Sequence, residues 1–416
     1  MNMKKKLFND YITAIDIGTT KIVVLISTVN SDGSFEITGV GQSPSYGLKK
    51  GVVVNIGQTV GAVKKALKQA EEMAGIKVES ACVGISGGHI KSFNSTGVVA
   101  IKGHEVSQSD IDRVIEAAKA IAIPQDQEII HILPQYFKVD GQDYVLDSMG
   151  MFGVRLEAQV HIITGSIASA QNIIKSCELS GIKVSEIVLE QLASANAVLT
   201  PFEKEMGAGI LDIGGGTSDF AIYKDGRIRY SKVIPIAGNH FTSDLALGLG
   251  IPTSKAEDIK KRFGTVSLDK ILCLQNKTED VDLGFDGGVK SIELSAASEI
   301  LRFRAEEIFE IIFDDLLEMR LKNLMPAGLV LTGGGGLLDG IQEIASKRLD
   351  MPVRIGIPQC QTDSIPDLLR SPAYSTGFGL LLHSMGLVDG KEFFSGDKST
   401  IGKIFKKMKS WIYDFL

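Results

Sequence analysis

Hydrophobic residues along the chain fall into short apolar runs separated by glycine turns, and one such arrangement occurs twice. Residues 11–27 read YITAIDIGTTKIVVLIS, an apolar run, a turn and a second apolar run. Residues 207–223, GAGILDIGGGTSDFAIY, repeat this plan, with Asp-Ile-Gly at 16–18 and again at 212–214. Apolar runs of this length, broken by glycine, are typical of buried β-strands joined by tight turns.

A third strand-like run follows each copy, FEITGV at 35–40 and IRYSKVIPIA at 228–237. Two three-stranded meanders far apart in one chain predict a duplicated α/β fold with two similar halves. The alternative at this point is coincidence, because β-hairpins with glycine turns are common.

The segment between the copies, residues 84–162, has the pattern of a separate subdomain. It contains one amphipathic helix, SQSDIDRVIEAAKAIAI, and the strand-like runs HILPQYFKVD and EAQVHIITG. Ser107 and Asp110 stand three residues apart where this helix begins, which is the spacing of a capping pair. We therefore expect an inserted α+β subdomain.

Helices dominate the pattern after the second copy. SKAEDIKKRFG predicts a short helix that begins with a Ser254–Glu257 capping box and ends at Gly264. A longer helix is predicted through ASEILRFRAEEIFEIIFDDLLEMRLKNL, ended by Pro326. AGLVLTGGGGLLDGIQEIASKRL then predicts a strand, four glycines and a helix that opens at Leu337.

Composition and charge describe an acidic globular protein. The chain has 416 residues, 44% of them hydrophobic, which is enough for two to four domains. The net charge is −6, and the segment from Lys398 onward has five lysines and one aspartate, so the preceding 397 residues carry −10. This balance argues against nucleic-acid binding. Four cysteines without a CxxC pair indicate a reducing cytoplasm, and no apolar run is long enough to span a membrane.

Several familiar catalytic motifs are missing from the sequence. It has no Walker A motif, and GVGQSP at 39–44 lacks the last glycine of GxGxxG. It also has no HExxH, and its six histidines are scattered, so we expect no zinc site.

The two Asp-Ile-Gly turns carry the candidate chemistry. Glycine lets the backbone approach an anion closely, and successive N–H groups form an anion-binding nest. Asp16 and Asp212, at the strand ends, are placed to hold a hydrated Mg²⁺ against phosphates. Lys21 adds positive charge, unless strand alternation points it away from the turn. The other candidates are the glycines Gly18, Gly214, Gly215 and Gly216 and the hydroxyls of Thr19, Thr20, Thr217 and Ser218.

One such turn alone could be an ordinary hairpin, but two copies and a third glycine loop form a specific set. The third loop consists of Gly333, Gly334, Gly335 and Gly336. The set resembles the actin/Hsp70/hexokinase superfamily, with DIGTTK and LDIGGGTSDFAIY similar to its two phosphate motifs and LVLTGGGG similar to its adenosine motif. The resemblance implies a duplicated actin-like ATPase fold with two halves around a cleft for ATP and Mg²⁺.

The same resemblance implies roles for residues outside the glycine turns. Glu257 and Lys260 match the helix that contacts adenosine in the superfamily. Gln191 or Glu190, in VLEQLASANAVL, matches the catalytic position that orients the attacking water. The other interpretation of Glu190 and Gln191 is an ordinary helix start, and the sequence leaves both open.

Within the superfamily, the chain resembles the FtsA family of bacterial cell-division proteins over nearly its whole length. GLKKGVVVNI, LPQYFKVDG, RLEAQVHIITG, LEQLASANAVLT and KVIPIAGNHFTSDLA are similar to its segments, in order. Residues 268–292 cannot be matched, so we assign no contacts there. The implied division is a first half (1–83 and 163–195), an insert (84–162), a second half (196–240 and 308–386, its end returning to the first), a further subdomain (241–307), a linker (387–400) and a terminal amphipathic helix (401–416).

The last segment, IGKIFKKMKSWIYDFL, separates its apolar and basic residues completely on a helical wheel. Its apolar residues fall within an arc of about 140°. A helix of about 24 Å with four lysines is too short and too charged to span a bilayer, so we expect it to lie in the interface. Docking on the protein's own core or in a partner's groove is the alternative. The apolar arc holds Ile401, Ile404, Phe405, Met408, Trp411, Ile412, Phe415 and Leu416, and the lysines are Lys403, Lys406, Lys407 and Lys409.

The family resemblance implies an ATP-binding, actin-like cell-division protein with slow or incidental hydrolysis. Such a protein would polymerise head to tail and tether the FtsZ ring to the cytoplasmic face of the inner membrane, on anionic lipid, at the division site. It would recruit later division proteins through residues 84–162. Two alternatives are a small-molecule kinase of the same fold, which needs a catalytic carboxylate at an acceptor pocket, and an FtsA-like pilus-assembly protein, which needs no amphipathic tail.

Overall fold

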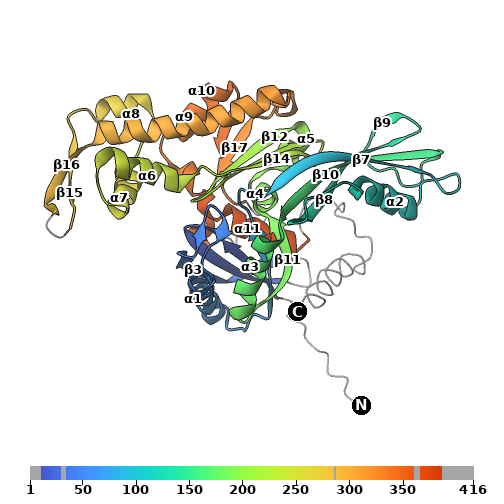
Figure 1. Ribbon diagram of the computed structural model, residues 1–416, viewed down its shortest axis with the longest axis horizontal. Coiled ribbons are helices and arrows are strands. Elements are labelled where there is room, and N and C mark those ends of the chain that lie inside the picture. The colour runs from blue at the N-terminus through green and yellow to red at the C-terminus, as the bar shows by residue number, and fades with distance from the viewer. Residues whose placement is uncertain (1–10, 30–33, 285–286, 360–365, 387–416) are drawn as a thin grey trace, which may run out of the picture.

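The computed structural model describes residues 11–29, 34–284, 287–359 and 366–386. Its described part contains two five-stranded sheets, a four-stranded sheet and the helices that cover them (Figure 1). The expected linker 387–400 and amphipathic helix 401–416 lie outside the described residues.

The first half is built on a sheet with the strand order β11-β6-β1-β2-β3. The meander pairs antiparallel, and β6 and β11 extend it in parallel. Helix α1 (Ile56–Ala74) lies so close to β3 that a Cβ on Gly41 would fall 1.8 Å from the Ala66 carbonyl oxygen. The strands are β1 (Tyr11–Ile17), β2 (Lys21–Val29), β3 (Phe35–Pro44), β6 (Ser80–Ile85) and β11 (Lys183–Leu189).

The second half repeats this topology, with the strand order β14-β13-β12-β17-β18. Its meander is again antiparallel, and its last two strands again pair in parallel. The duplicated α/β fold predicted from the two apolar patterns is therefore confirmed. The strands are β12 (Ala208–Ile213), β13 (Ser218–Lys224), β14 (Arg227–Ile234), β17 (Leu329–Thr332) and β18 (Val353–Ile355).

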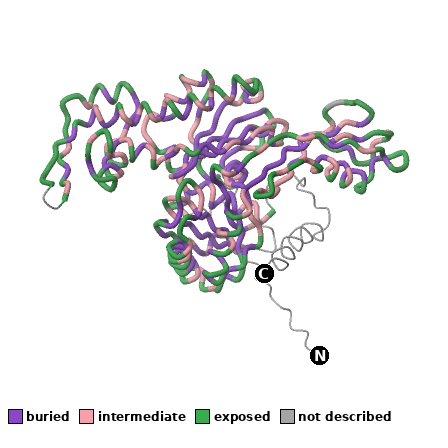
Figure 2. The backbone as a smooth tube through the Cα atoms, in the orientation of Figure 1, coloured by how far each residue is buried: buried purple, intermediate pink, exposed green. Residues whose placement is uncertain are grey.

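Each half has its own hydrophobic core, and the C-terminal end of the described chain returns to the first one. Helix α11 (Ser375–Ser384) packs against α4 (Glu190–Val198) and β1. Phe378 and Leu381 of α11 are fully buried among residues of the first half. Figure 2 shows buried residues concentrated in the centre of the molecule and exposed residues along its outer edges.

The insert forms a four-stranded antiparallel sheet at one end of the molecule (right in Figure 1). Helix α2 (Gln108–Lys119) packs on this sheet, and the predicted Ser107–Asp110 capping box is present. The strand order is β7-β10-β8-β9, with β7 (Lys91–Ala100), β8 (Gln127–Val139), β9 (Gln142–Val145) and β10 (Arg155–Ser166). Helix α3 (Ile167–Leu179) follows and leads back to the first half. The domain boundaries assigned from the sequence remain predictions.

A polar seam joins the insert to β14 of the second half; it consists of Ser92, Gln135 and His161 with the facing residues of β14. Gln135 Nε2 donates to the carbonyl oxygens of Ile228 (3.1 Å) and Arg229 (3.2 Å). The Ser92 hydroxyl donates to the Ser231 carbonyl oxygen at 2.6 Å, and the Ser231 hydroxyl lies 2.9 Å from Nε2 of His161. Burial lowers the pKa of His161 to about 4, so its ring is neutral in this seam.

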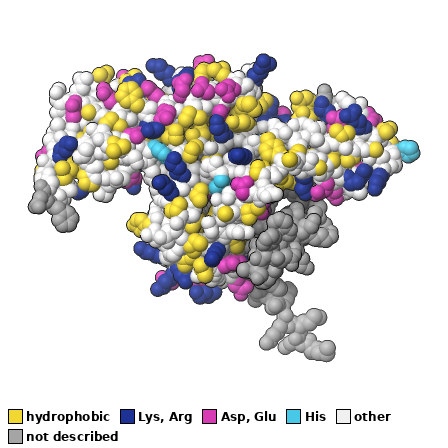
Figure 3. Space-filling model, viewed as in Figure 1, with side chains coloured by type: hydrophobic (Ala, Val, Ile, Leu, Met, Phe, Trp, Pro, Cys, Tyr) yellow, Lys and Arg dark blue, Asp and Glu magenta, His cyan; other side chains and the backbone are white. Residues whose placement is uncertain are grey.

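The opposite end of the molecule is largely helical (left in Figure 1). Side chains of both charge signs occur on the face shown in Figure 3. None of the helices in the described ranges is long and apolar enough to cross a bilayer. The remaining elements are β4 (Leu48–Lys49), β5 (Val52–Val53), α5 (Pro201–Met206), α6 (Gly238–Leu249), α7 (Thr253–Phe263), α8 (Leu268–Cys273), β15 (Thr278–Asp282), β16 (Val289–Glu293), α9 (Leu294–Glu318) and α10 (Ile341–Leu349).

Three local expectations are wrong. The long helix ends at Glu318, well before Pro326, because Arg320 turns to a positive φ of 53°. The glycine loop forms a 3₁₀ turn, and α10 begins only after Gly340, whose φ of 82° interrupts the helix expected from Leu337. The Ser254–Glu257 capping box is absent because Pro252 is the N-cap and Glu257 bonds elsewhere.

Candidate functional site

A cavity of about 600 Å³ opens where the two halves meet. This volume lies in the usual range of small-molecule sites. Of the residues that the sequence nominated as cofactor contacts, Ser218 and Gly336 do not line it, and the Ser218 hydroxyl donates instead to the Ile236 carbonyl oxygen at 2.6 Å. All the others do, from both Asp-Ile-Gly turns, the third glycine loop and α7. These residues are Asp16, Gly18, Thr19, Thr20, Lys21, Asp212, Gly214, Gly215, Gly216, Thr217, Glu257, Lys260, Gly333, Gly334 and Gly335.

The two turns face one another so closely that only glycine fits in the second one. A Cβ on Gly215 would lie 2.3 Å from Thr20, and one on Gly216 would lie 2.4 Å from Thr19. The Thr19 hydroxyl accepts from the Gly51 backbone N–H at 3.0 Å, which fixes the first turn. The resulting wall exposes backbone to the cavity, as an anion-binding nest requires.

Four carboxylates line the base of the cavity; those of Asp16, Asp212 and Asp219 are buried, and that of Glu190 is half-buried. Burial raises the pKa of Asp16 to about 6 and that of Asp219 to about 7. Burial and the other three carboxylates raise the pKa of Glu190 well above its ordinary range. Such crowded negative charge favours a cation at this position.

Lys21 is the cation that the structure itself brings to these carboxylates. Strand alternation left its direction open, and the structure places it on the cavity wall. Its Nζ donates to the Ala373 carbonyl oxygen and lies 3.6 Å from the centroid of the Tyr374 ring. Burial lowers the pKa of Lys21 below its ordinary value, and the charges of Asp16 and Asp212 offset only part of this shift.

The carboxylates suit a hydrated Mg²⁺ better than a bare ion. Within the described residues, no group of three or more His, Cys, Asp and Glu side chains is arranged to bind one metal directly. Mg²⁺ retains several waters and commonly uses one or two carboxylates together with phosphate oxygens. Asp16 and Asp212, both lining the cavity, match that requirement.

The two candidate catalytic residues occupy different environments. Glu190, at the start of α4, lines the cavity, and a Cβ on Gly84 would lie 3.2 Å from its Cγ. Gln191 is fully buried and is not among the lining residues. Neither end of its amide has a hydrogen-bond partner in the described parts of the chain. Of the pair, Glu190 is therefore the one that lines the cavity.

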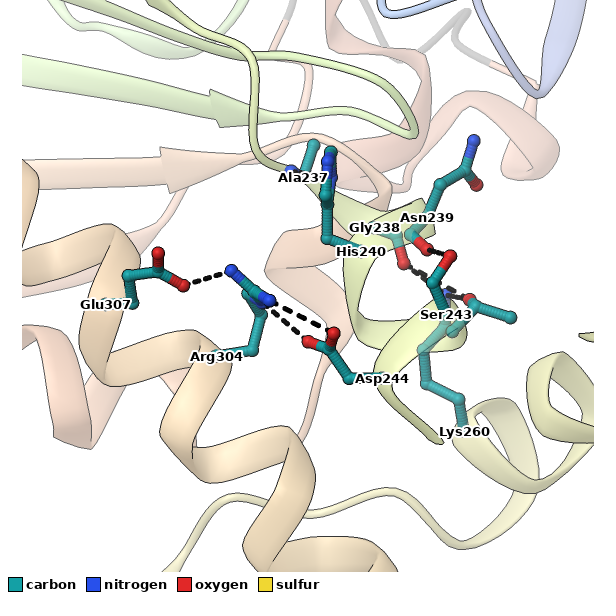
Figure 4. Close-up of polar contacts among 10 residues, drawn as sticks. Ala237, Gly238, Asn239, His240, Ser243, Asp244, Lys260, Arg304 and Glu307 are labelled. Atoms are coloured by element: carbon teal, nitrogen blue, oxygen red, sulfur yellow. Dashed lines mark hydrogen bonds and ion pairs between the residues drawn. The ribbon is translucent and has the colours of Figure 1, made fainter. Parts of the chain in front are cut away.

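The far end of the cavity is formed by α6 and α7 (Figure 4). Lys260 Nζ donates to the Gly238 carbonyl oxygen at 2.9 Å and lies 2.6 Å from the Glu257 carboxylate. Burial opposes the charge on Glu257, but the bonds from Lys260 and Thr242 lower its pKa below the ordinary value. Glu257 and Lys260 thus form a charged pair beside the cavity.

Helix α6 is itself held in place by α9. Arg304 binds the Asp244 carboxylate through Nε at 2.6 Å and through a second guanidinium nitrogen at 3.0 Å, and it also bonds Glu307 (Figure 4). A bidentate pair of this kind fixes orientation as well as distance. The α6 side of the cavity is therefore anchored to α9.

Proteins similar to this chain in sequence over nearly its whole length are cell-division proteins. The chain is 42% identical to cell division protein FtsA of Pseudomonas aeruginosa over 409 residues, covering 96% of this chain and 97% of that protein. The chain belongs to the FtsA family. Residues 209–379 match the family model for cell division protein FtsA, and residues 87–164 match that for the SHS2 domain inserted in it. FtsA of Escherichia coli K12 is 35% identical, covering 96% of this chain and 97% of that one.

Solved structures with the same fold include more distant members of the actin-like class. A chain of the PilM–PilN type IV pilus biogenesis complex has a TM-score of 0.66 at 14% identity, covering 91% of this chain and 99% of its own. MreB5 of Spiroplasma citri, solved with ADP, has a TM-score of 0.52 at 15% identity, covering 91% and 99%. At these identities the likeness shows the fold alone. This FtsA-family chain is thus a cell-division protein with an actin-like fold.

Sequence reasoning missed Asp219 and Thr376, which line the cavity, and Ser194, which bonds Asp212. Asp219 lies two residues after Thr217, on the same face of its strand, so period-two alternation could have identified it. Ser194 lies on α4, 18 residues before Asp212, and α4 contacts β12 directly. Thr376 comes from 164 residues after Asp212, and the packing of α11 against α4 brings it there.

Proposed function

We propose that the cavity binds ATP with Mg²⁺ and that the nucleotide controls an actin-like assembly in cell division. The observation that carries this proposal is the convergence of both Asp-Ile-Gly turns and the third glycine loop on one cavity. The ADP in the MreB5 structure of the same fold supports it.

In this proposal each part of the lining has a separate task. The N–H groups of the two turns bind phosphate oxygens from opposite halves. Asp16 and Asp212 would hold the hydrated Mg²⁺, which when bound would neutralise phosphate charge. Glu257 and Lys260 lie at the adenosine end, and Glu190 orients the attacking water. The crowded carboxylates are suited to slow ATP hydrolysis and to nucleotide control of the assembly state.

ATP titration of the full chain by calorimetry tests the cleft. Gly215→Val should abolish measurable binding, because its first side-chain carbon would lie 2.3 Å from Thr20. Gly61→Val is the matched control, since a Cβ there meets nothing within 4 Å. If Gly215→Val binds ATP as the parent does, the cleft is not the nucleotide site.

We further propose that residues 401–416 anchor the protein peripherally on the cytoplasmic face of the inner membrane. The separation of apolar and basic residues around this segment supports the proposal. Four lysines near an anionic surface contribute about 4 kcal/mol to the free energy of membrane binding, and insertion of the apolar face adds to that. A single tail of this strength binds reversibly, while an array of tails on one polymer gains by avidity.

Vesicle co-sedimentation tests the anchor on anionic and neutral lipid. The full chain should sediment with anionic vesicles, less so at high salt. The protein that lacks 401–416 and the Trp411→Glu variant should both remain in solution, whereas the Trp411→Phe variant should bind anionic vesicles like the parent. Equal sedimentation of the deletion and the parent would remove the anchor from the proposal.

The tether itself is the last part of this proposal. Membership in the FtsA family supports a polymer that links the FtsZ ring to the membrane at the division site and recruits later division proteins through the insert. In a reconstitution, FtsZ should co-sediment with vesicles only when the full chain is present. Co-sedimentation of FtsZ with the 401–416 deletion would contradict the tether.

A further inference from the structure

The carboxylate of Asp212 belongs to the second half, but hydroxyl groups of the first half hold it. Thr376 Oγ1, at the start of α11, donates to Asp212 Oδ2 at 2.9 Å. Ser194 Oγ, in α4, donates to the same oxygen. The two hydroxyls lie 3.1 Å apart, so three side chains from three elements form one closed group.

Both donors bind Oδ2 of this carboxylate, and neither binds its other oxygen. The second oxygen, Oδ1, lies beside Gly333, where a Cβ would be only 2.2 Å away. Gly333 lines the cavity, has a φ of 81° and therefore leaves room for this oxygen. Asp212 and Ser194 are buried, so rotation of the carboxylate would leave hydroxyl groups unsatisfied.

We propose that Ser194 and Thr376 are positioning residues for Asp212, presenting its free oxygen to the water shell of a nucleotide-bound Mg²⁺. The inference rests on the proposed ATP and Mg²⁺ function and extends it to residues that do not contact the ion. Because the donors and the acceptor belong to different halves, the carboxylate is correctly held only while the halves keep this arrangement. Closure of the cleft and preparation of the metal site are then one event.

A purely structural role for the two hydroxyls makes a different prediction. Hydroxyls that only joined the halves would affect ATP binding equally with and without Mg²⁺. A positioning role acts through the ion, so its loss must depend on the ion. The ratio of ATP affinities in excess Mg²⁺ and in excess EDTA separates the two.

The test uses the full chain and the pair Thr376→Val and Thr376→Ser, which differ in whether they keep the hydroxyl. Thr376→Val should reduce the Mg²⁺-dependent gain in ATP affinity roughly tenfold, the effect of one hydrogen bond to a charged group. Thr376→Ser should retain the gain. Ser194→Ala should reproduce the loss through an independent element, and thermal unfolding shows that each variant is folded.

Each outcome of this titration decides a separate statement. An unchanged gain in both Thr376→Val and Ser194→Ala, or an equal loss with and without Mg²⁺, overturns the positioning role while the ATP site stands. The same loss in Thr376→Ser as in Thr376→Val also overturns it, because the hydroxyl would then not be the cause. No ATP binding by the parent protein would instead overturn the proposed function.

Discussion

Asp219 should make the nucleotide-free protein less stable as the pH rises, and Asp219→Asn should remove this effect. The side chain is buried, with Oδ1 2.5 Å from the Ser86 hydroxyl and Oδ2 3.0 Å from that of Thr217. Burial raises its pKa from 3.8 to about 7, with Asp212 and Asp16 adding to the shift against the two hydroxyls.

The sign of the effect follows from proton binding. Between about pH 4 and pH 7, the folded protein keeps a proton on Asp219 that the unfolded chain releases, so raising the pH favours unfolding. At 1.36 kcal/mol per pKa unit, the two units between about pH 5 and the folded pKa correspond to a loss on the order of 3 kcal/mol. Above pH 7 this contribution is constant.

Urea unfolding at about pH 5 and about pH 8, without nucleotide, measures this loss directly. The difference in unfolding free energy between the two pH values should shrink by on the order of 3 kcal/mol in Asp219→Asn. Asp258→Asn is the control, because that carboxylate is 57% exposed on α7. A pH dependence in Asp219→Asn equal to that of the parent would refute the reasoning.

Three further substitutions test the packing. Gln135→Leu should lower the free energy of unfolding by about 1–3 kcal/mol, because a buried and a half-buried carbonyl oxygen of β14 lose this donor. Gln142→Leu, at an exposed position, should change it little, and calorimetry measures both. Ser107→Ala should cost about 1 kcal/mol through loss of the capping box at α2, measured by urea unfolding, whereas Ser107→Asp should retain most of it. Arg354→Lys should cost about 1 kcal/mol in the same measurement, since lysine cannot make the two 2.6 Å bonds to Glu203, and no loss would show that this pair is not stabilising.

The sequence predicted those parts of the fold that depend on neighbours along the chain. Both meanders follow from apolar runs around a glycine turn, and the cap at Ser107 follows from a spacing of three residues. The glycine-turn residues that line the cavity were found for the same reason, since each belongs to a short local sequence motif. Glu257 shows the limit of such reasoning, because its spacing from Ser254 suggested a cap, yet a bond from Thr242 of the neighbouring α6 and an ion pair with Lys260 in its own helix direct it elsewhere.

Contacts between distant segments could not be predicted in this way. Thr376 meets Asp212 and Ser194 only because the last described helix returns to the first half. The direction of Lys21 depends on Ala373 and Tyr374, more than 350 residues away. Neither arrangement has a periodicity or a spacing that a single sequence can reveal.

The seam between the insert and β14 has a mechanical consequence. The chain enters the insert from the first half, just after Ser86, and leaves it at α3, but its seam bonds belong to the second half. Ser86 also bonds Asp219 in the cavity wall. Rotation of the halves must therefore bend the two chain connections or break the seam. A movement of the insert is thus transmitted to β14 through the seam and, through Ser86, to the cavity wall.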